Sequence, residues 1–168
     1  MIKLRQLAAA FIFNGDRILL MKRADQKGLF GGLWAPVGGH LEPDELNDPR
    51  RACLREIEEE IGLTESDFSS FEEKYVTVRR KANEIRIQYL YIAATQATVR
   101  KETDEGELHW INLTELFDRP FSTVNESALK HYFKTGKHSG EVFVGVVNVT
   151  NGAPVVTWEA LASYDSFY

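Results

Sequence analysis

The chain has 168 residues and a mass of 19.1 kDa, a usual length for one domain that buries its own core. Hydrophobic residues make up 43% and charged residues 27%, a globular balance that excludes a disordered tail, a collagen and a coiled coil. Twenty Lys and Arg residues against 25 Asp and Glu residues give a net charge of −5. Because duplex binding draws on a basic surface, we expect no duplex nucleic acid as a partner.

Cys53 is the only cysteine, so an intrachain disulfide is excluded and a reducing, cytoplasmic location is predicted. No apolar run approaches the roughly 18 residues of a membrane span, so no membrane partner is expected. The sequence holds no repeat, low-complexity tract or Pro/Ser-rich linker. We therefore expect a single domain over residues 1–168, as a monomer or a homodimer.

The chain begins with a predicted β-hairpin over residues 4–22. Asn14-Gly15 separates two apolar runs there, and Asn-Gly between such runs is the strongest short-range hairpin signal. A loop rich in glycine and aromatic residues is expected next, over residues 24–36.

Two helices are predicted from their end signals. The first has Asp48 as N-cap, Pro49 as first helical residue and Gly62 as left-handed C-cap. The second is expected over residues 126–135, with Asn125 as N-cap.

The remaining elements are predicted strands, in part joined as hairpins. They cover residues 74–80, 84–93, 109–112, 141–149 and 154–158. Strands interleaved with helices, several of them hairpin partners, indicate an α/β fold in which a mixed β-sheet is sandwiched between α-helices.

The first helix carries separate apolar and acidic arcs. At about 100° per residue, three apolar side chains fall on one arc and three carboxylates on another. The apolar arc is Leu54, Ile57 and Ile61, and the acidic arc is Glu56, Glu59 and Glu60. Such carboxylates repel one another unless they are neutralised or protonated, and oxygen ligands favour Mg²⁺ or Mn²⁺. The alternative is a solvated acidic face, but Gly38-Gly39, which allow close backbone approach, and nearby Glu45 favour a metal site.

This stretch resembles the signature of the Nudix hydrolases, which hydrolyse nucleoside diphosphates linked to another moiety. Gly39, five residues, Glu45 and then residues 55–63 fill nearly every fixed position of that signature. Nine residues separate Glu45 from Arg55 where the family has seven, which indicates a two-residue insertion before the helix. Glu42 is the alternative to Glu45.

Residues 19–23 and 32–39 are similar to the segments before the signature in MutT-like nucleoside triphosphate hydrolases, including those that act on 8-oxo-dGTP. Residues 106–116 and 137–140 resemble segments that follow it in the same branch. The resemblance therefore implies the Nudix fold, Mg²⁺ or Mn²⁺ as cofactor and a nucleotide polyphosphate as substrate.

The resemblance also implies roles for individual residues. The metal ligands are Glu56, Glu59, Glu60 and the Gly39 carbonyl. Arg55 orients a glutamate of the signature; on spacing alone, it equally suits a surface ion pair. The general base comes from either of two places in the family, which here are Glu56 and Glu105.

The candidate substrate-binding residues fall in three pairs, each with a structural alternative. Lys22 and Arg23 contact phosphates or, alternatively, guard a strand edge. Phe30 and Trp34 stack on a purine or, alternatively, fill a hydrophobic position as a plug. Asn125 and Glu126 read the edge of a nucleobase, unless Asn125 only caps the helix. Ala35 stands where some oxidised-guanine hydrolases carry Asn, which weakens an 8-oxo-dGTP assignment.

The sequence thus predicts a Mg²⁺-dependent pyrophosphohydrolase that converts a nucleoside triphosphate, normal or oxidised, into a monophosphate and pyrophosphate. The alternatives are a hydrolase of ADP-ribose, dinucleoside polyphosphates or 5′-triphosphate RNA ends, and a Nudix-fold ligand sensor without turnover.

Overall fold

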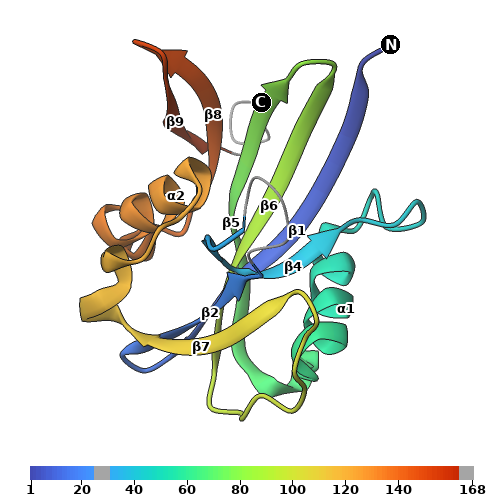
Figure 1. Cartoon of the computed structure of the whole chain (residues 1–168), viewed down its shortest axis with the longest axis vertical. Helices are drawn as coiled ribbons and strands as arrows, with labels where there is room; N and C mark the ends of the chain where they lie inside the picture. Colours follow the sequence, from blue (N-terminus) through green and yellow to red (C-terminus); the bar gives the residue numbers. More distant parts are fainter. Residues whose placement is uncertain (25–30, 163–168) are drawn as a thin grey trace.

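The computed structural model describes residues 1–24 and 31–162 (Figure 1). Within them, nine strands form one mixed sheet in the order β3-β2-β1-β6-β5-β8-β9, with β4 paired to β1 and β7 paired to β2. The strands are β1 Lys3–Asn14, β2 Arg17–Arg23, β3 Trp34–Ala35, β4 Val37–His40, β5 Phe68–Lys81, β6 Glu84–Thr95, β7 Gly106–Asn112, β8 Val142–Thr150 and β9 Ala153–Leu161. The helices are α1 Pro49–Ile61 and α2 Thr123–Lys134, with short 3₁₀ helices at Glu65–Asp67, Leu113–Asp118 and Gly136–His138.

The predicted hairpins are all present. β1 and β2 pair antiparallel across the Asn14-Gly15 turn, β5 pairs with β6 and β8 pairs with β9. Parallel pairs β1–β6 and β5–β8 make the sheet mixed, as expected. Strands β5 and β7 begin earlier than predicted, at Phe68 and Gly106, because ladder pairing with β6 and β2 continues past the clear alternation in the sequence.

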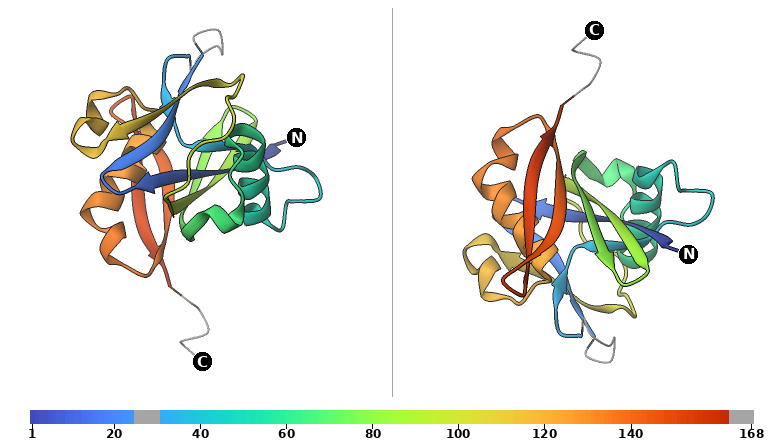
Figure 2. Two further views of the ribbon diagram at one scale, coloured as in Figure 1. Left: turned by 90° about the horizontal axis from the view of Figure 1, so that it is seen from below. Right: turned by 90° about the horizontal axis from the view of Figure 1, so that it is seen from above.

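Helices α1 and α2 lie on opposite faces of the sheet (Figure 2). A hydrophobic layer lies under each of them. Strand β1 supplies both layers by alternation: Ala8 and Ala10 pack with α1, whereas Ala9 and Phe11 pack with α2. The predicted sandwich of a mixed sheet between helices is therefore confirmed. None of the helices in residues 1–24 and 31–162 is both long and apolar enough to cross a membrane.

Helix α1 has the ends that the sequence predicts. The Asp48 side chain accepts a hydrogen bond from the Arg51 backbone N–H at 3.0 Å, and Pro49 occupies the first turn, where its missing N–H costs nothing. Gly62 ends the helix with a φ of 73°, and its N–H bonds to the Glu58 carbonyl.

Helix α2 begins three residues earlier than predicted, at Thr123, and its N-cap is Ser122 rather than Asn125. The Ser122 hydroxyl accepts the Asn125 backbone N–H at 3.4 Å. Ser and Asn are both good caps, so the sequence alone gave no physical reason to prefer the earlier one. Since Asn125 lies inside the first turn, its side chain is released from capping.

Candidate active site

Strand β4 brings two glycines against helix α1. Gly38 and Gly39 pair with Ala9 and Ala8 of β1. A Cβ on Gly39 would lie 2.5 Å from the nearer Glu56 carboxylate oxygen, so only a glycine lets that carboxylate rest against the strand. Gly38 has a φ of 143°, and a side chain there would collide with the β1 backbone.

The three glutamates of the acidic arc reach one cleft beside these glycines. Glu60 accepts a hydrogen bond from the Gly38 N–H at 3.3 Å, and burial together with the Glu56 charge raises the pKa of Glu60 to about 7. Burial also raises the pKa of Glu56, although Arg55 acts in the opposite direction. The Glu59 side chain is 60% exposed at the cleft mouth. The predicted acidic arc is confirmed, because all three glutamates line the same space. Of the predicted apolar arc, Ile57 and Ile61 are buried in the core, whereas Leu54 is only partly buried.

Arg55 ties the acidic helix to the loop before it. Its Nε and Nη2 donate to the two carboxylate oxygens of Glu45 at 2.9 Å each, and Nη2 also donates to the His40 carbonyl at 3.1 Å. Its Nη1 lies 3.0 Å from Glu56 and 3.1 Å from Glu59. Arg55 thus contacts two glutamates of the acidic arc in addition to Glu45. It therefore makes more contacts than the single surface ion pair of the alternative interpretation.

The two-residue insertion leaves Glu45 in place. The Glu45 side chain is only 1% exposed, and the hydrogen bonds from Arg55 lower its pKa to about 2. Glu42 is exposed, and its backbone N–H donates to Glu45 at 2.9 Å. Consecutive turns through the Glu45 and Asp48 N–H groups absorb the extra residues before the helix starts. Glu42 therefore does not replace Glu45.

The opposite wall of the cleft is the segment 102–105, which precedes β7. Glu105 lies 3.5 Å from the Arg23 guanidinium, and its backbone N–H donates to the Thr103 hydroxyl at 3.1 Å. The Glu105 charge also contributes to the raised pKa of Glu60, which indicates that the two carboxylates face the same space. The cleft has a volume of about 530 Å³.

The donor set of the cleft fits an oxygen-coordinated divalent cation. Within residues 1–24 and 31–162, no group of three or more His, Cys, Asp or Glu side chains is arranged so that it could hold a metal ion. However, Glu56 and Glu60 have raised pKa values, so a cation would relieve the cost of ionising them together. Carboxylate and carbonyl oxygens are the ligands that Mg²⁺ and Mn²⁺ prefer.

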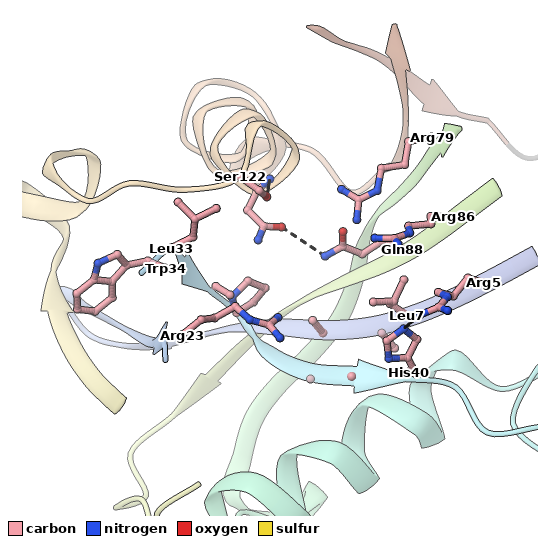
Figure 3. A pocket seen from close by; sticks show the side chains of 17 residues that line it. Arg5, Leu7, Arg23, Leu33, Trp34, His40, Arg79, Arg86, Gln88 and Ser122 are labelled. Carbon is pink, nitrogen blue, oxygen red and sulfur yellow. Dashed lines mark hydrogen bonds between the residues drawn. The ribbon is translucent and has the colours of Figure 1, made fainter. Parts of the chain in front are cut away.

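A second pocket, here called the basic pocket, adjoins the cleft across β4 (Figure 3). It has a volume of about 300 Å³ and shares Arg23 and the Gly38-Gly39 backbone with the cleft. Its wall changes from apolar at Leu33 and Trp34, through amides, to cationic at the other end (Figure 3). The amides are Gln88 and Asn125, whose side chains lie 3.4 Å apart, and the cations are Arg5, Arg79 and Arg86.

The structure separates the two basic candidates. Arg23 lines both the cleft and the basic pocket. Lys22 is exposed, points to the other side of β2 and lines neither. Because β3 and β7 flank Lys22 on both sides, the edge-guard alternative is wrong for this residue.

The aromatic and helix candidates divide in the same way. Trp34 is 8% exposed, packs 5.3 Å from the His109 ring and still lines the basic pocket, so it has both expected roles available. Asn125 points into the pocket, whereas Glu126 pairs with Lys130 on α2 and does not line the pocket. Phe30 lies outside the described residues.

Sequence reasoning missed the pocket arginines and Gln88. They come from three strands, and the available signal was a polar residue at every second position of β6: Glu84, Arg86 and Gln88. Without the strand register, nothing in the sequence indicates that Arg5 and Arg79 flank that row.

The sequence of this chain is similar to the sequences of known proteins. A model of the NUDIX domain family matches residues 3–132. The RNA pyrophosphohydrolase of Gluconacetobacter diazotrophicus is 44% identical over 63 residues, which are 34% of this chain and 36% of that protein. The nucleoside triphosphatase NudI of Escherichia coli is 43% identical over 58 residues, which are 34% and 40% of the two chains. The chain thus matches well under half the length of these curated relatives.

The fold is similar over nearly the whole length to a solved structure of MutT from Bacillus halodurans. The TM-score is 0.70 at 20% identity, and the match covers 93% of this chain and 97% of that one. At that identity the likeness concerns the fold, and it confirms the MutT-like architecture expected from the sequence. Since the family model spans residues 3–132 of 168, the chain belongs to the NUDIX domain family.

Proposed function

We propose that the protein is a Mg²⁺-dependent pyrophosphohydrolase that cleaves a nucleoside triphosphate to a monophosphate and pyrophosphate. One observation carries this proposal: the acidic cleft and the basic pocket share Gly38, Gly39 and Arg23. A nucleotide in the pocket can therefore extend its phosphates over the glycines to the carboxylates. This arrangement also explains how an acidic chain binds a polyanion.

Glu56, Glu59, Glu60 and the Gly39 carbonyl are the groups that would hold the cation. When bound, Mg²⁺ neutralises phosphate charge and assists attack by water on a phosphorus atom. Arg55 contacts two of these glutamates and is fixed by buried Glu45, so it holds the acidic arc in one arrangement. In this role Arg55 is a positioning residue.

We assign the general base to Glu105. Glu56 is pressed against Gly39 and contacted by Arg55, which suits a fixed ligand. Glu105 lies on the facing wall, beside Arg23, where a water molecule between the walls can reach its carboxylate. Arg23 is the candidate phosphate contact, since it lies between the general base Glu105 and the basic pocket.

Trp34 and Asn125 are the proposed contacts to the nucleobase of the substrate. Trp34 offers an apolar surface at one end of the pocket, and Asn125 offers an amide that can both donate and accept. The curated relatives are named as a nucleoside triphosphatase and an RNA pyrophosphohydrolase; the first name supports a nucleoside triphosphate as the substrate, and the second supports a pyrophosphohydrolase reaction. The buried free thiol of Cys53 suits the cytoplasmic location that we also propose.

A panel of substrates tests this function. Phosphate and pyrophosphate release is measured with Mg²⁺ for nucleoside triphosphates, 8-oxo-dGTP, ADP-ribose, a dinucleoside polyphosphate and an RNA with a 5′-triphosphate. We expect pyrophosphate from a nucleoside triphosphate, and loss of turnover in Glu60→Gln with an unchanged circular dichroism spectrum. Turnover of a different class would replace the proposed substrate, and turnover of none of them would favour a ligand sensor.

A further inference from the structure

Three arginines form a row across the sheet at the cationic end of the basic pocket. In the strand register, Arg5 of β1 lies opposite Arg86 of β6, and Arg86 lies opposite Arg79 of β5. Directly paired residues project from the same face of a sheet, and all three side chains line the pocket (Figure 3). Three guanidinium groups are therefore adjacent on one surface.

The positive charge of the three arginines is only partly balanced by neighbouring carboxylates. Like charges in directly opposed positions destabilise a sheet. Within the described residues, Glu84 is the one carboxylate that pairs with the row: it lies 3.0 Å from Arg5 and also contacts Arg86. In that part of the chain, Arg79 has no ion pair, and burial together with the Arg86 charge lowers its pKa. Two positive charges in excess thus remain at the pocket end.

The position of the row separates it from the groups assigned to the scissile phosphates. The cleft with the glutamates is lined by Arg23 and the β4 glycines, whereas Arg5, Arg79 and Arg86 line the basic pocket and not the cleft. Trp34 lies at the opposite end of the same pocket (Figure 3). A ligand that fills the pocket and reaches the cleft consequently places a further part of itself beside the row.

We infer that the arginine row is a subsite for a second anionic group of the substrate, a phosphate or a carboxylate remote from the scissile phosphoanhydride. This inference rests on the proposed function and narrows its substrate class. A guanidinium row recognises either anion by charge-assisted hydrogen bonds, and Arg79, which lacks an ion pair in the described chain, is the residue most available for it. On a nucleoside triphosphate the second anion belongs to the ribose, and on the alternative substrates, nucleoside diphosphates linked to another moiety, it belongs to that moiety.

Two ligand pairs, each differing by one anionic group, distinguish these sources. Adenosine 3′-phosphate 5′-diphosphate is compared with ADP, and UDP-glucuronate is compared with UDP-glucose. Binding is measured by calorimetry with EDTA present, so no turnover is required and a failure of the proposed hydrolysis leaves this test intact. We expect at least one pair to show a preference of about tenfold or more for the additional anion. The pair that does so identifies the source.

Arg79→Gln is expected to reduce that preference to about twofold, and Arg79→Lys to retain part of it. Arg80→Gln is the matched control, because Arg80 is the next residue of β5, is exposed and does not line the pocket. If Arg79→Gln fails to fold, Arg5→Gln, whose side chain is 48% exposed in the wild type, replaces it. The subsite is refuted if neither pair shows a preference in the wild type, or if Arg80→Gln reduces it as strongly as Arg79→Gln.

Discussion

The acidic cleft and the basic pocket share a wall, but they are assembled in different ways. The proposed cation ligands Glu56, Glu59, Glu60 and Gly39, together with Arg55, come from residues 38–60, where a strand, a loop and a helix follow one another, whereas Glu105 comes from the separate segment 102–105. The basic pocket takes its side chains from each of the strands β1 to β6 and from the start of α2. Helical periodicity alone brings the three carboxylates of α1 together, whereas strand register must bring the arginines together.

This difference predicts a division of labour. Groups that share one rigid segment keep a fixed geometry, which the chemical step requires, and groups from many strands shape the space that selects the ligand. Substitutions in the cleft should therefore lower kcat, and those in the pocket should raise KM. Three substitutions test this division, and a fourth, Glu45→Gln, tests how the acidic helix is supported; they follow from the largest expected effect to the smallest.

Glu105→Gln is expected to lower kcat by about 1,000-fold, because a glutamine amide cannot accept the proton of the attacking water. Steady-state kinetics and Mg²⁺ titration measure the effect, with affinity for the cation nearly unchanged. Glu56→Gln is the comparison and should weaken Mg²⁺ binding as well. If Glu56→Gln alone removes the base limb of the pH–rate profile, the assignment of Glu105 is wrong.

Gly39→Ala is expected to lower kcat by about 100-fold, since its Cβ would lie 2.5 Å from a Glu56 oxygen and must displace that carboxylate. Gly140→Ala is the control, because a Cβ on Gly140 meets nothing within 4 Å. Thermal unfolding of both variants should stay close to wild type. Full activity in Gly39→Ala would show that the contact between β4 and Glu56 is not needed for turnover.

Glu45→Gln should lower the free energy of unfolding by about 2 kcal/mol at pH 7, because Arg55 loses two charged hydrogen bonds. The folded-state pKa of Glu45 is lowered from 4.5 to about 2, so its contribution is present above pH 4.5 and is lost as the pH falls towards 2. Urea denaturation should show the difference between wild type and variant shrinking over that range. Glu42→Gln, at an exposed position, should match wild type at pH 7; equal losses in the two variants would contradict the Glu45–Arg55 account.

Asn125→Ala is expected to raise KM by about tenfold with little change in kcat, the loss of one polar contact to the ligand. Glu126→Ala is the matched control on the same helical turn, since Glu126 pairs with Lys130 and does not line the pocket. A large fall in kcat for Asn125→Ala would break the proposed division between cleft and pocket.

The sequence predicted what local chemistry determines. Asn14-Gly15 identified the first hairpin, and Asp48, Pro49 and Gly62 fixed the ends of α1, because each acts on its own neighbours in the chain. The predicted N-cap Asn125 was wrong, because a second capping residue, Ser122, stands one turn earlier. Local sequence signals do not decide which of two nearby capping residues begins the helix.

Longer-range features needed the structure. Glu45 and Glu42 are both acidic residues before the helix, and only the turn geometry shows which of them reaches Arg55. The pairing of Arg5, Arg86 and Arg79 depends on the parallel register of β1 with β6 and the antiparallel register of β5 with β6. A shift of one residue would send Arg86 to the other face, so composition and periodicity cannot predict the row.

The alanine run of β1 has a consequence for how this protein tolerates mutation. Ala8 and Ala9 pair with Gly39 and Gly38, and both are almost completely buried. A larger side chain at Ala8 would push α1 away from the sheet, and one at Ala9 would push α2 away, on the two faces of the strand that pairs with the glycines. A mutational scan should consequently show that Ala8 and Ala9 do not tolerate larger side chains, although neither has a functional group and neither is assigned a ligand contact.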